Sequence, residues 1–110
     1  MQHAAFTLRV KQGEQNAYLE AHRTGIIWPS IVEACRLAGM VNYSGWIGGD
    51  EDRQIFAYFE SEDVRASLEL LSANQANSEW QGHMAHLMDT RNEVGVDREL
   101  ALLRPAFFLP

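Results

Sequence analysis

The sequence is short of cysteine, of basic residues and of long apolar runs. Cys35 is the only cysteine, so no disulfide can form within the chain, and we expect a reducing, cytoplasmic location. Lys11 is the only lysine, and nine basic residues against fifteen acidic ones give a net charge of −6. Nucleic acid and anionic membranes are bound by clustered basic side chains, so we expect neither as a partner. No apolar run approaches the ~18 residues of a membrane span, and the first residues lack a signal-peptide pattern.

The residues that are present predict one α+β domain over residues 1–110. Apolar alternation predicts strands, and apolar residues three and four apart predict helices. Gly25 and Gly39 are expected to end helices, Pro29 to begin one and Asp63 to cap one. In chain order we predict a strand at 6–10, helices at 14–22 and 29–38, strands at 41–47 and 54–60, helices from 64 and at 78–91, a loop at 92–97, and a strand at 100–109.

This order of elements is β-α-β-β-α-β, which is typical of a ferredoxin-like sandwich. Helices then cover one face of an antiparallel sheet, and the other face needs a cover of its own. A chain of 110 residues is too short to cover both faces easily, and a second copy of the chain can cover the open one. The apolar end, Phe107 to Pro110, supports this arrangement. We therefore expect a homodimer in which two sheets face each other, as in a dimeric α/β barrel.

Two side chains stand four residues apart on the first predicted helix, Tyr18 and His22. An i, i+4 pair projects from one helix face, so a phenol and an imidazole point toward the same space. Imidazole titrates near neutral pH and is the usual general acid or base. From spacing alone, an ordinary surface or core-edge pair remains the more common role.

The other candidates are aromatic or imidazole residues on separate elements. Tyr43 lies on a predicted strand, with Val41 and Ile47 expected on the same face. Trp80 and His83 are three apart on a helix, and core packing is the more common role for the tryptophan. His83-x-x-His86 is a weak metal pattern without a supporting motif, so we expect no metal.

Nucleophilic and phosphate-binding chemistry find no support in the sequence. Cys35 falls in an apolar helical pattern with Ile31, Val32 and Ala38, which favours a buried, inert thiol. There is no G-x-S-x-G and no phosphate-binding glycine loop. The acidic run of residues 50–52 is read as a solvated turn.

A set of short motifs, in order along nearly the whole chain, resembles the L-rhamnose mutarotase family. They are Tyr18-x-x-x-His22, Trp28-Pro29, Asn42-Tyr43-Ser44, Trp80-x-x-x-Met84 and Phe108-Leu109-Pro110. The resemblance implies a dimeric α/β fold and the cofactor-free interconversion of the α and β anomers of L-rhamnose or a related sugar. It also implies that His22 is the proton donor and that Tyr18, Tyr43, Trp80 and the neighbouring Gln81 contact the sugar.

The chain departs from the family pattern at three places. Five residues separate His22 from Trp28, two more than is usual; Gln81 stands where the family has a second tryptophan; and Pro105 interrupts the last strand. Two alternatives stay open at this point. Dimeric ferredoxin-like proteins include cofactor-free oxygenases and haem-degrading enzymes, and a non-catalytic sugar-binding module can retain the fold.

Overall fold

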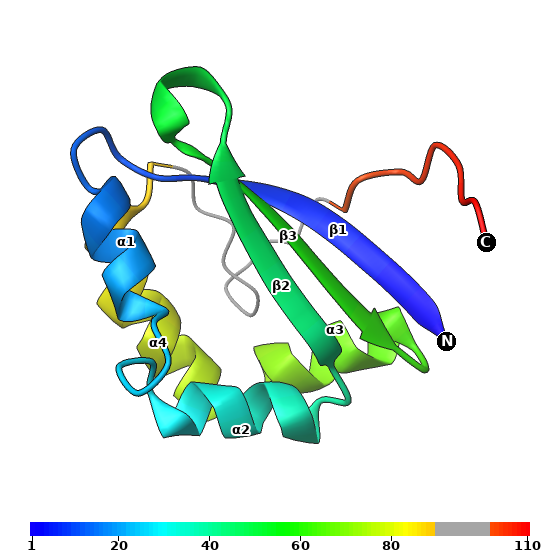
Figure 1. Cartoon of the computed structure of the whole chain (residues 1–110). Coiled ribbons are helices and arrows are strands. Elements are labelled where there is room, and N and C mark those ends of the chain that lie inside the picture. Colours follow the sequence, from blue (N-terminus) through cyan, green and yellow to red (C-terminus); the bar gives the residue numbers. More distant parts are fainter. Residues whose placement is uncertain (90–101) are drawn as a thin grey trace.

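The computed structural model describes residues 1–89 and 102–110, and the expected α+β class is confirmed (Figure 1). A three-stranded sheet is accompanied by helices that gather on one side of it. In chain order the elements, with η for a 3₁₀ turn, are β1 (Gln2–Arg9), α1 (Gln15–Ala21), α2 (Pro29–Leu37), β2 (Val41–Gly48), η1 (Asp50–Asp52), β3 (Gln54–Ser61), α3 (Val64–Ser72), α4 (Gln75–Met84) and η2 (Ala85–Leu87).

The sheet has the order β1-β3-β2, and both pairings are antiparallel. Phe6 of β1 pairs with Ala57 of β3 on one side and forms a bridge with Leu102 on the other. The backbone N–H of Leu103 also donates to the Ala5 carbonyl at 2.7 Å. Leu102 and Leu103 therefore lie at the edge of β1, where the fourth strand of a β-α-β-β-α-β fold belongs.

The predicted final strand over residues 100–109 is wrong in its described part. Only Leu102 forms a bridge, and residues 103–110 have no regular secondary structure. Pro105 has no N–H to donate to a ladder, which explains why pairing does not continue along β1. The tail instead leaves the sheet, with Phe107 and Phe108 strongly exposed (Figure 1). Residues 100 and 101 of the predicted strand and the predicted loop at 92–97 lie outside the described residues.

The helix predicted at 78–91 corresponds to α4, which begins three residues earlier, at Gln75, and ends at Met84. The Asn74 side chain accepts hydrogen bonds from the N–H groups of Ala76 and Asn77, so this residue caps the helix and sets its start at Gln75. The helix ends at Met84, and η2 follows directly. By contrast, the predicted cap at Asp63 is confirmed, because its carboxylate accepts from the Ala66 N–H at 3.1 Å.

The core lies between the helices and one face of the sheet. Along β3, Ile55, Ala57 and Phe59 are buried, whereas Phe56 and Tyr58 point to the opposite, open face. Burial accordingly alternates from one residue to the next along β3. On α2 the buried residues are Ile31 and Ala34, with Ala38 just beyond the helix, and the predicted place of Val32 on this face is wrong, since half of it is exposed.

An irregularity in β2 decides which face Tyr43 occupies. Val41 pairs with Glu60 and Ser44 with Tyr58, so two residues of β2 stand opposite one residue of β3. Asn42, with φ of 52°, is the extra residue of this bulge. The expectation that Val41 shares a face with Tyr43 is therefore wrong. The Tyr43 ring lies on the helix-covered face, against Phe6 and Phe59.

Candidate active site

A chain of aromatic and imidazole rings joins α1, the turn before α2, and α4. The ring centroids of Tyr18 and His22 are 4.3 Å apart, and His22 meets the edge of Trp80 at 5.4 Å. Trp80 in turn meets Trp28 at 5.2 Å, and Trp28 lies against His83 at 4.6 Å. The structure thus brings together three of the residues proposed from the sequence and adds Trp28 and His83.

The position of α1 depends on few contacts. No residue of this helix is fully buried, and Tyr18 and Ala21 are its two partly buried residues that pack on the core. Because the phenol ring holds the helix against the core, His22 at the helix end is directed toward α4. The predicted i, i+4 pair therefore brings the Tyr18 and His22 rings together, and it also places His22 against Trp80 of α4.

The five residues between His22 and Trp28 fold back into a compact turn. The N–H groups of Ile26 and Ile27 both donate to the Arg23 carbonyl, at 2.9 and 3.0 Å. Gly25 has φ of +88°, a conformation that L side chains rarely adopt, so the turn requires glycine here. The turn absorbs the two additional residues and still returns Trp28 to Trp80.

The ring of His22 has a defined hydrogen bond. Its Nδ1 lies 2.8 Å from the backbone carbonyl oxygen of Tyr18. Burial lowers the pKa of the His22 imidazole, and the hydrogen bond to Tyr18 raises it to a smaller extent. The imidazole is therefore neutral at pH 7, which suits a group that exchanges protons with a neutral substrate.

Two phenols and one thiol, those of Tyr18, Tyr43 and Cys35, have raised pKa values. Burial raises the pKa of the Tyr18 phenol to about 12. Burial also raises the pKa of the Tyr43 phenol, with smaller contributions from the nearby Cys35 thiol and from Tyr18. Burial raises the pKa of Cys35 too, which agrees with the expected inert thiol, although the residue is only half-buried. All three groups stay protonated at neutral pH and can donate hydrogen bonds.

Trp80 and Gln81 offer less to a ligand than their neighbours do. Trp80 is only 7% exposed, since it is enclosed by the rings of His22, Trp28 and His83. Gln81 is half-buried, and its amide N–H donates to the Asn77 side-chain oxygen at 3.3 Å. Tyr43, by contrast, exposes 46% of its surface while its ring rests on the core. Tyr43 is therefore more accessible to a ligand than Trp80.

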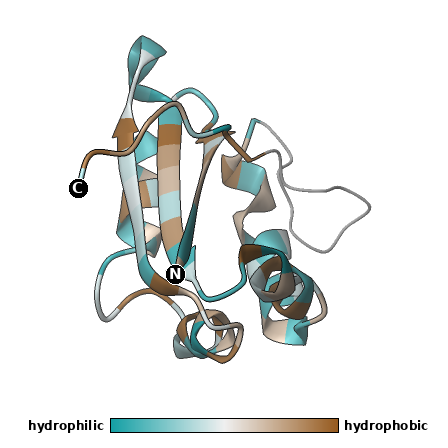
Figure 2. Ribbon diagram, turned by 90° about the vertical axis from the view of Figure 1, so that its right-hand side faces the viewer, coloured by the Kyte–Doolittle hydropathy of each residue, from teal (hydrophilic) through white to brown (hydrophobic). Residues whose placement is uncertain are grey.

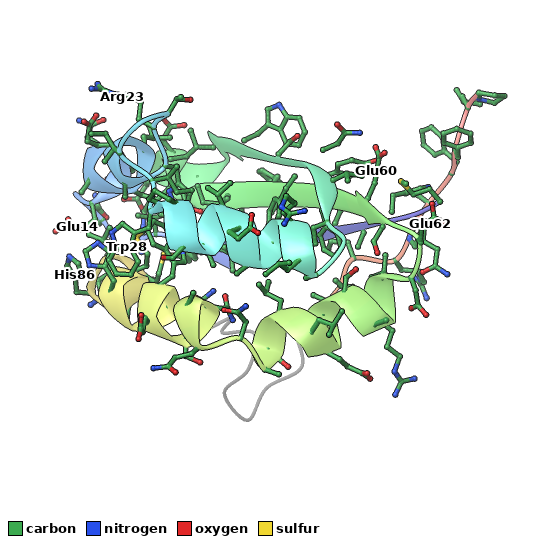
Figure 3. The ribbon with its side chains drawn as sticks, turned by 90° about the horizontal axis from the view of Figure 1, so that it is seen from below. Glu14, Arg23, Trp28, Glu60, Glu62 and His86 are labelled. Atoms are coloured by element: carbon green, nitrogen blue, oxygen red, sulfur yellow. The ribbon has the colours of Figure 1, made fainter. Side chains whose placement is uncertain are left out.

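Two of the rings joined in this way, those of Trp28 and His83, were given no catalytic or sugar-binding role from the sequence. The Trp28-Pro29 motif and the three-residue spacing of Trp80 and His83 are the signals that point to them. Trp28 and His86 lie at the same end of the molecule (Figure 3). His83 and His86 have ring centroids 6.3 Å apart, but no group of three metal-ligating side chains occurs within residues 1–89 and 102–110.

The arrangement combines a neutral imidazole with hydroxyl donors and apolar ring surface. Such groups can hydrogen-bond the hydroxyl groups of a polar, uncharged molecule and move protons to and from them. In the part of the chain that the structure describes, no helix has the length and apolar character to cross a bilayer.

Comparisons with known proteins agree with this chemistry. The model of the L-rhamnose mutarotase family matches residues 3–109. An L-rhamnose mutarotase from Burkholderia ambifaria is 32% identical over 112 residues, covering all of both chains.

Two solved structures share the fold. The L-rhamnose mutarotase FA22100 from Formosa agariphila superimposes with a TM-score of 0.69 at 22% identity and covers all of both chains. An uncharacterized NIPSNAP domain protein from Burkholderia xenovorans reaches 0.61 at 16% identity, covering 100% of this chain and 99% of that one. The second likeness illustrates that the fold by itself does not decide between functions.

Proposed function

The chain belongs to the L-rhamnose mutarotase family, and on this premise we propose that it is a sugar mutarotase, an isomerase that interconverts the α and β anomers of L-rhamnose or a close relative. The observation that carries the proposal is the family match over residues 3–109, together with the contact between the Tyr18 and His22 rings. The same match favours this activity over an oxygenase or a haem-degrading enzyme. We propose one catalytic domain over residues 1–110, acting without a cofactor in the cytoplasm.

The reaction needs only proton transfer. The anomeric hydroxyl must lose a proton, and the ring oxygen must gain one, so that the pyranose opens, C1 rotates and the ring closes again. We assign the proton transfer to His22, whose neutral imidazole touches Tyr18 and Trp80. General acid–base help of this kind contributes about 10²–10⁴-fold.

Sugar binding is assigned to Tyr18, Tyr43, Trp80 and Gln81. The two phenols remain protonated and can donate to sugar hydroxyls. The rings around His22 provide an apolar surface for the C–H face and methyl group of a 6-deoxy sugar. Since Trp80 is largely enclosed, only the edge of its ring is expected to contact the sugar, and Tyr43 provides the larger accessible surface.

The experiment is anomeric exchange of L-rhamnose followed by NMR, with a panel of other sugars for comparison. We expect line broadening or saturation transfer between the anomers with L-rhamnose. His22→Asn should lose the acceleration and keep the circular dichroism spectrum, whereas His86→Asn, an exposed histidine on η2, serves as the matched control. Sugar binding without exchange would identify a binding module, and absence of exchange with every sugar would reject the proposal.

We further propose that the chain is a homodimer whose sheets face each other. The open face of the sheet carries Trp46, exposed by 59%, beside its pairing partner Phe56, exposed by 42%. The tail adds Phe107 and Phe108, exposed by 81% and 72%. Figure 2 shows the hydrophobic stretch before the C-terminus on the side away from the helices. Exposed large apolar side chains of this kind suit an association site.

The mass in solution tests the dimer. Light scattering should give twice the chain mass of 12.5 kDa. Trp46→Glu should shift the protein toward the monomer, while Leu37→Glu, at an exposed apolar position of α2, should leave the mass unchanged. A parent protein that remains a monomer at high concentration would reject the dimer without affecting the assignment of the reaction.

A further inference from the structure

Three side chains of α1 attach this helix to the rest of the molecule. Gln15, Tyr18 and His22 are spaced by three and four residues, so they project from the same helix face. Tyr18 packs on the core, and the His22 ring at the helix end contacts Trp80. At the helix start, the side-chain amide of Gln15 donates from Nε2 to the backbone carbonyl of Glu51 at 3.0 Å. The helix is therefore held at its start, near its middle and at its end.

The attachment at the start is important because α1 is short and contains no fully buried residue. Its 7 residues span about 10 Å, and Tyr18 lies near the middle of that length. A rigid segment that is held only near its middle can tilt about that point. A movement of Gln15 in one direction then moves His22 in the other. The hydrogen bond from Gln15 opposes this tilt at the end of α1 that lies farthest from His22.

The turn between β2 and β3 presents the accepting carbonyl through an uncommon backbone conformation. Glu51 and Asp52 have φ of 55° and 59°, and they follow Gly49 with φ of 74°. L side chains rarely adopt this left-handed region, and such conformations persist where the surrounding structure holds them. The N–H of Asp52 donates to the Gly49 carbonyl at 3.1 Å and closes the turn. The closed turn brings the Glu51 carbonyl to the start of α1, at one end of the sheet (Figure 1).

Arg53 fixes the base of the same hairpin. Its side chain is only 12% exposed, and Nε donates to the Val10 carbonyl at 2.9 Å. One terminal nitrogen donates to the Asp89 carboxylate at 2.7 Å, and the other lies 3.9 Å from the Glu51 carboxylate. The Val10 N–H donates in return to the Arg53 carbonyl at 2.9 Å. A guanidinium presents its donors in one rigid plane, so the turn that receives Gln15 has a fixed base.

We infer that Gln15 is a positioning residue: the hydrogen bond from its amide to the hairpin, whose base Arg53 anchors, holds α1 at the angle that keeps His22 against Trp80. The inference rests on the proposed function and goes beyond it, because Gln15 acts through α1 rather than by touching the sugar. The proposed reaction needs the imidazole in a fixed place relative to the sugar. A misplacement of about 1 Å can lower a rate by about 10²-fold.

Chemical shifts test the position of His22 without any substrate. The neighbouring rings of Tyr18 and Trp80 shift the signals of the His22 ring protons, so a tilt of α1 should move these signals. Gln15→Met keeps the length of the side chain but removes the donor, and it should move both the His22 ring signals and the Trp80 indole N–H signal. Gln15→Lys offers a new donor to the same carbonyl and should return both toward the parent values. Asn16→Ala, at the exposed neighbouring position, is the matched control and should leave them unchanged.

The kinetics of anomeric exchange test the consequence for the reaction. Gln15→Met should lower kcat on L-rhamnose about tenfold and change KM by less than about twofold, because Tyr43 and Gln81 lie on other elements. Gln15→Lys should recover most of kcat, and Asn16→Ala should retain all of it. A purely stabilising role of Gln15 would lower the midpoint of thermal unfolding but leave kcat and the native chemical shifts of the folded protein unchanged. That pattern, or the same loss in Asn16→Ala, would overturn the inference.

A double-variant cycle tests the part of Arg53. Arg53→Lys keeps the charge that faces Asp89 but loses the Nε–H donor to Val10, so it should move the His22 signals in the same direction as Gln15→Met. In the Gln15→Met background it should move them little further, because the link from the hairpin to α1 is already broken. Fully additive shifts would remove Arg53 from this link.

The two readouts also separate the inference from the proposed function. Absence of exchange with every sugar would reject the proposed function alone, because the chemical shifts need no sugar. Parent signals of the His22 ring in Gln15→Met would overturn the positioning role, even where the parent protein catalyses exchange.

Discussion

Replacement of Trp80 by alanine tests the centre of the ring chain. Trp80 is 7% exposed and contacts the rings of His22, Trp28 and His83. Truncation of a buried tryptophan costs about 3–5 kcal/mol, a large share of the roughly 5–15 kcal/mol that stabilises a domain. For a domain of this size the midpoint of thermal unfolding should fall by more than about 12 °C. The loss should be greatest at α4 and α1, since Trp80 joins them.

The assay is urea unfolding followed by circular dichroism at one protein concentration, because a dimer's stability depends on concentration. Trp80→Phe keeps an aromatic ring in the same place and should lose less than Trp80→Ala. Leu37→Ala, at a position 62% exposed, is the matched control and should stay within about 0.5 kcal/mol of the parent. If Trp80→Ala were as stable as this control, the enclosed position of Trp80 would be wrong.

Three further predictions concern pH, a helix cap and the sugar contact. The pKa of His22 is lower in the folded chain, so the unfolded chain binds the proton more readily. The free energy of unfolding should therefore decrease as the pH falls through about 6.5. Urea unfolding should show a smaller decrease in His22→Asn. Asp63→Ala removes the acceptor for the Ala66 N–H and should lower the free energy of unfolding by about 1 kcal/mol, whereas Asp63→Asn should retain most of it. Gln81→Trp restores a second aromatic ring and should lower KM for L-rhamnose more than kcat changes; kinetics identical to the parent would exclude this position from sugar binding.

Local patterns in the sequence were sufficient for the order of the helices and strands from β1 to α4, although not for the final strand. The glycine and proline positions predicted the limits of α2, and Asp63 predicted the start of α3, because these residues act on the backbone beside them. The limits of α4 were missed, since the cap at Asn74 lies four residues before the predicted start. The bulge at Asn42 was also missed, because a shift of register depends on the pairing partner as well as on the strand itself.

The candidate site divides in the same way. The sequence alone determined that Tyr18 and His22 share a helix face, and the ordered motifs indicated the family, because both follow from spacing along the chain. Only the tertiary structure decided that Trp80 is enclosed, that Trp28 and His83 extend the ring chain, and that the longer turn before Trp28 leaves the contact between His22 and Trp80 intact. It also placed Nδ1 of His22 2.8 Å from the Tyr18 carbonyl oxygen. Burial and ring contacts arise between groups that the chain brings together only on folding, and no spacing in the sequence encodes them directly.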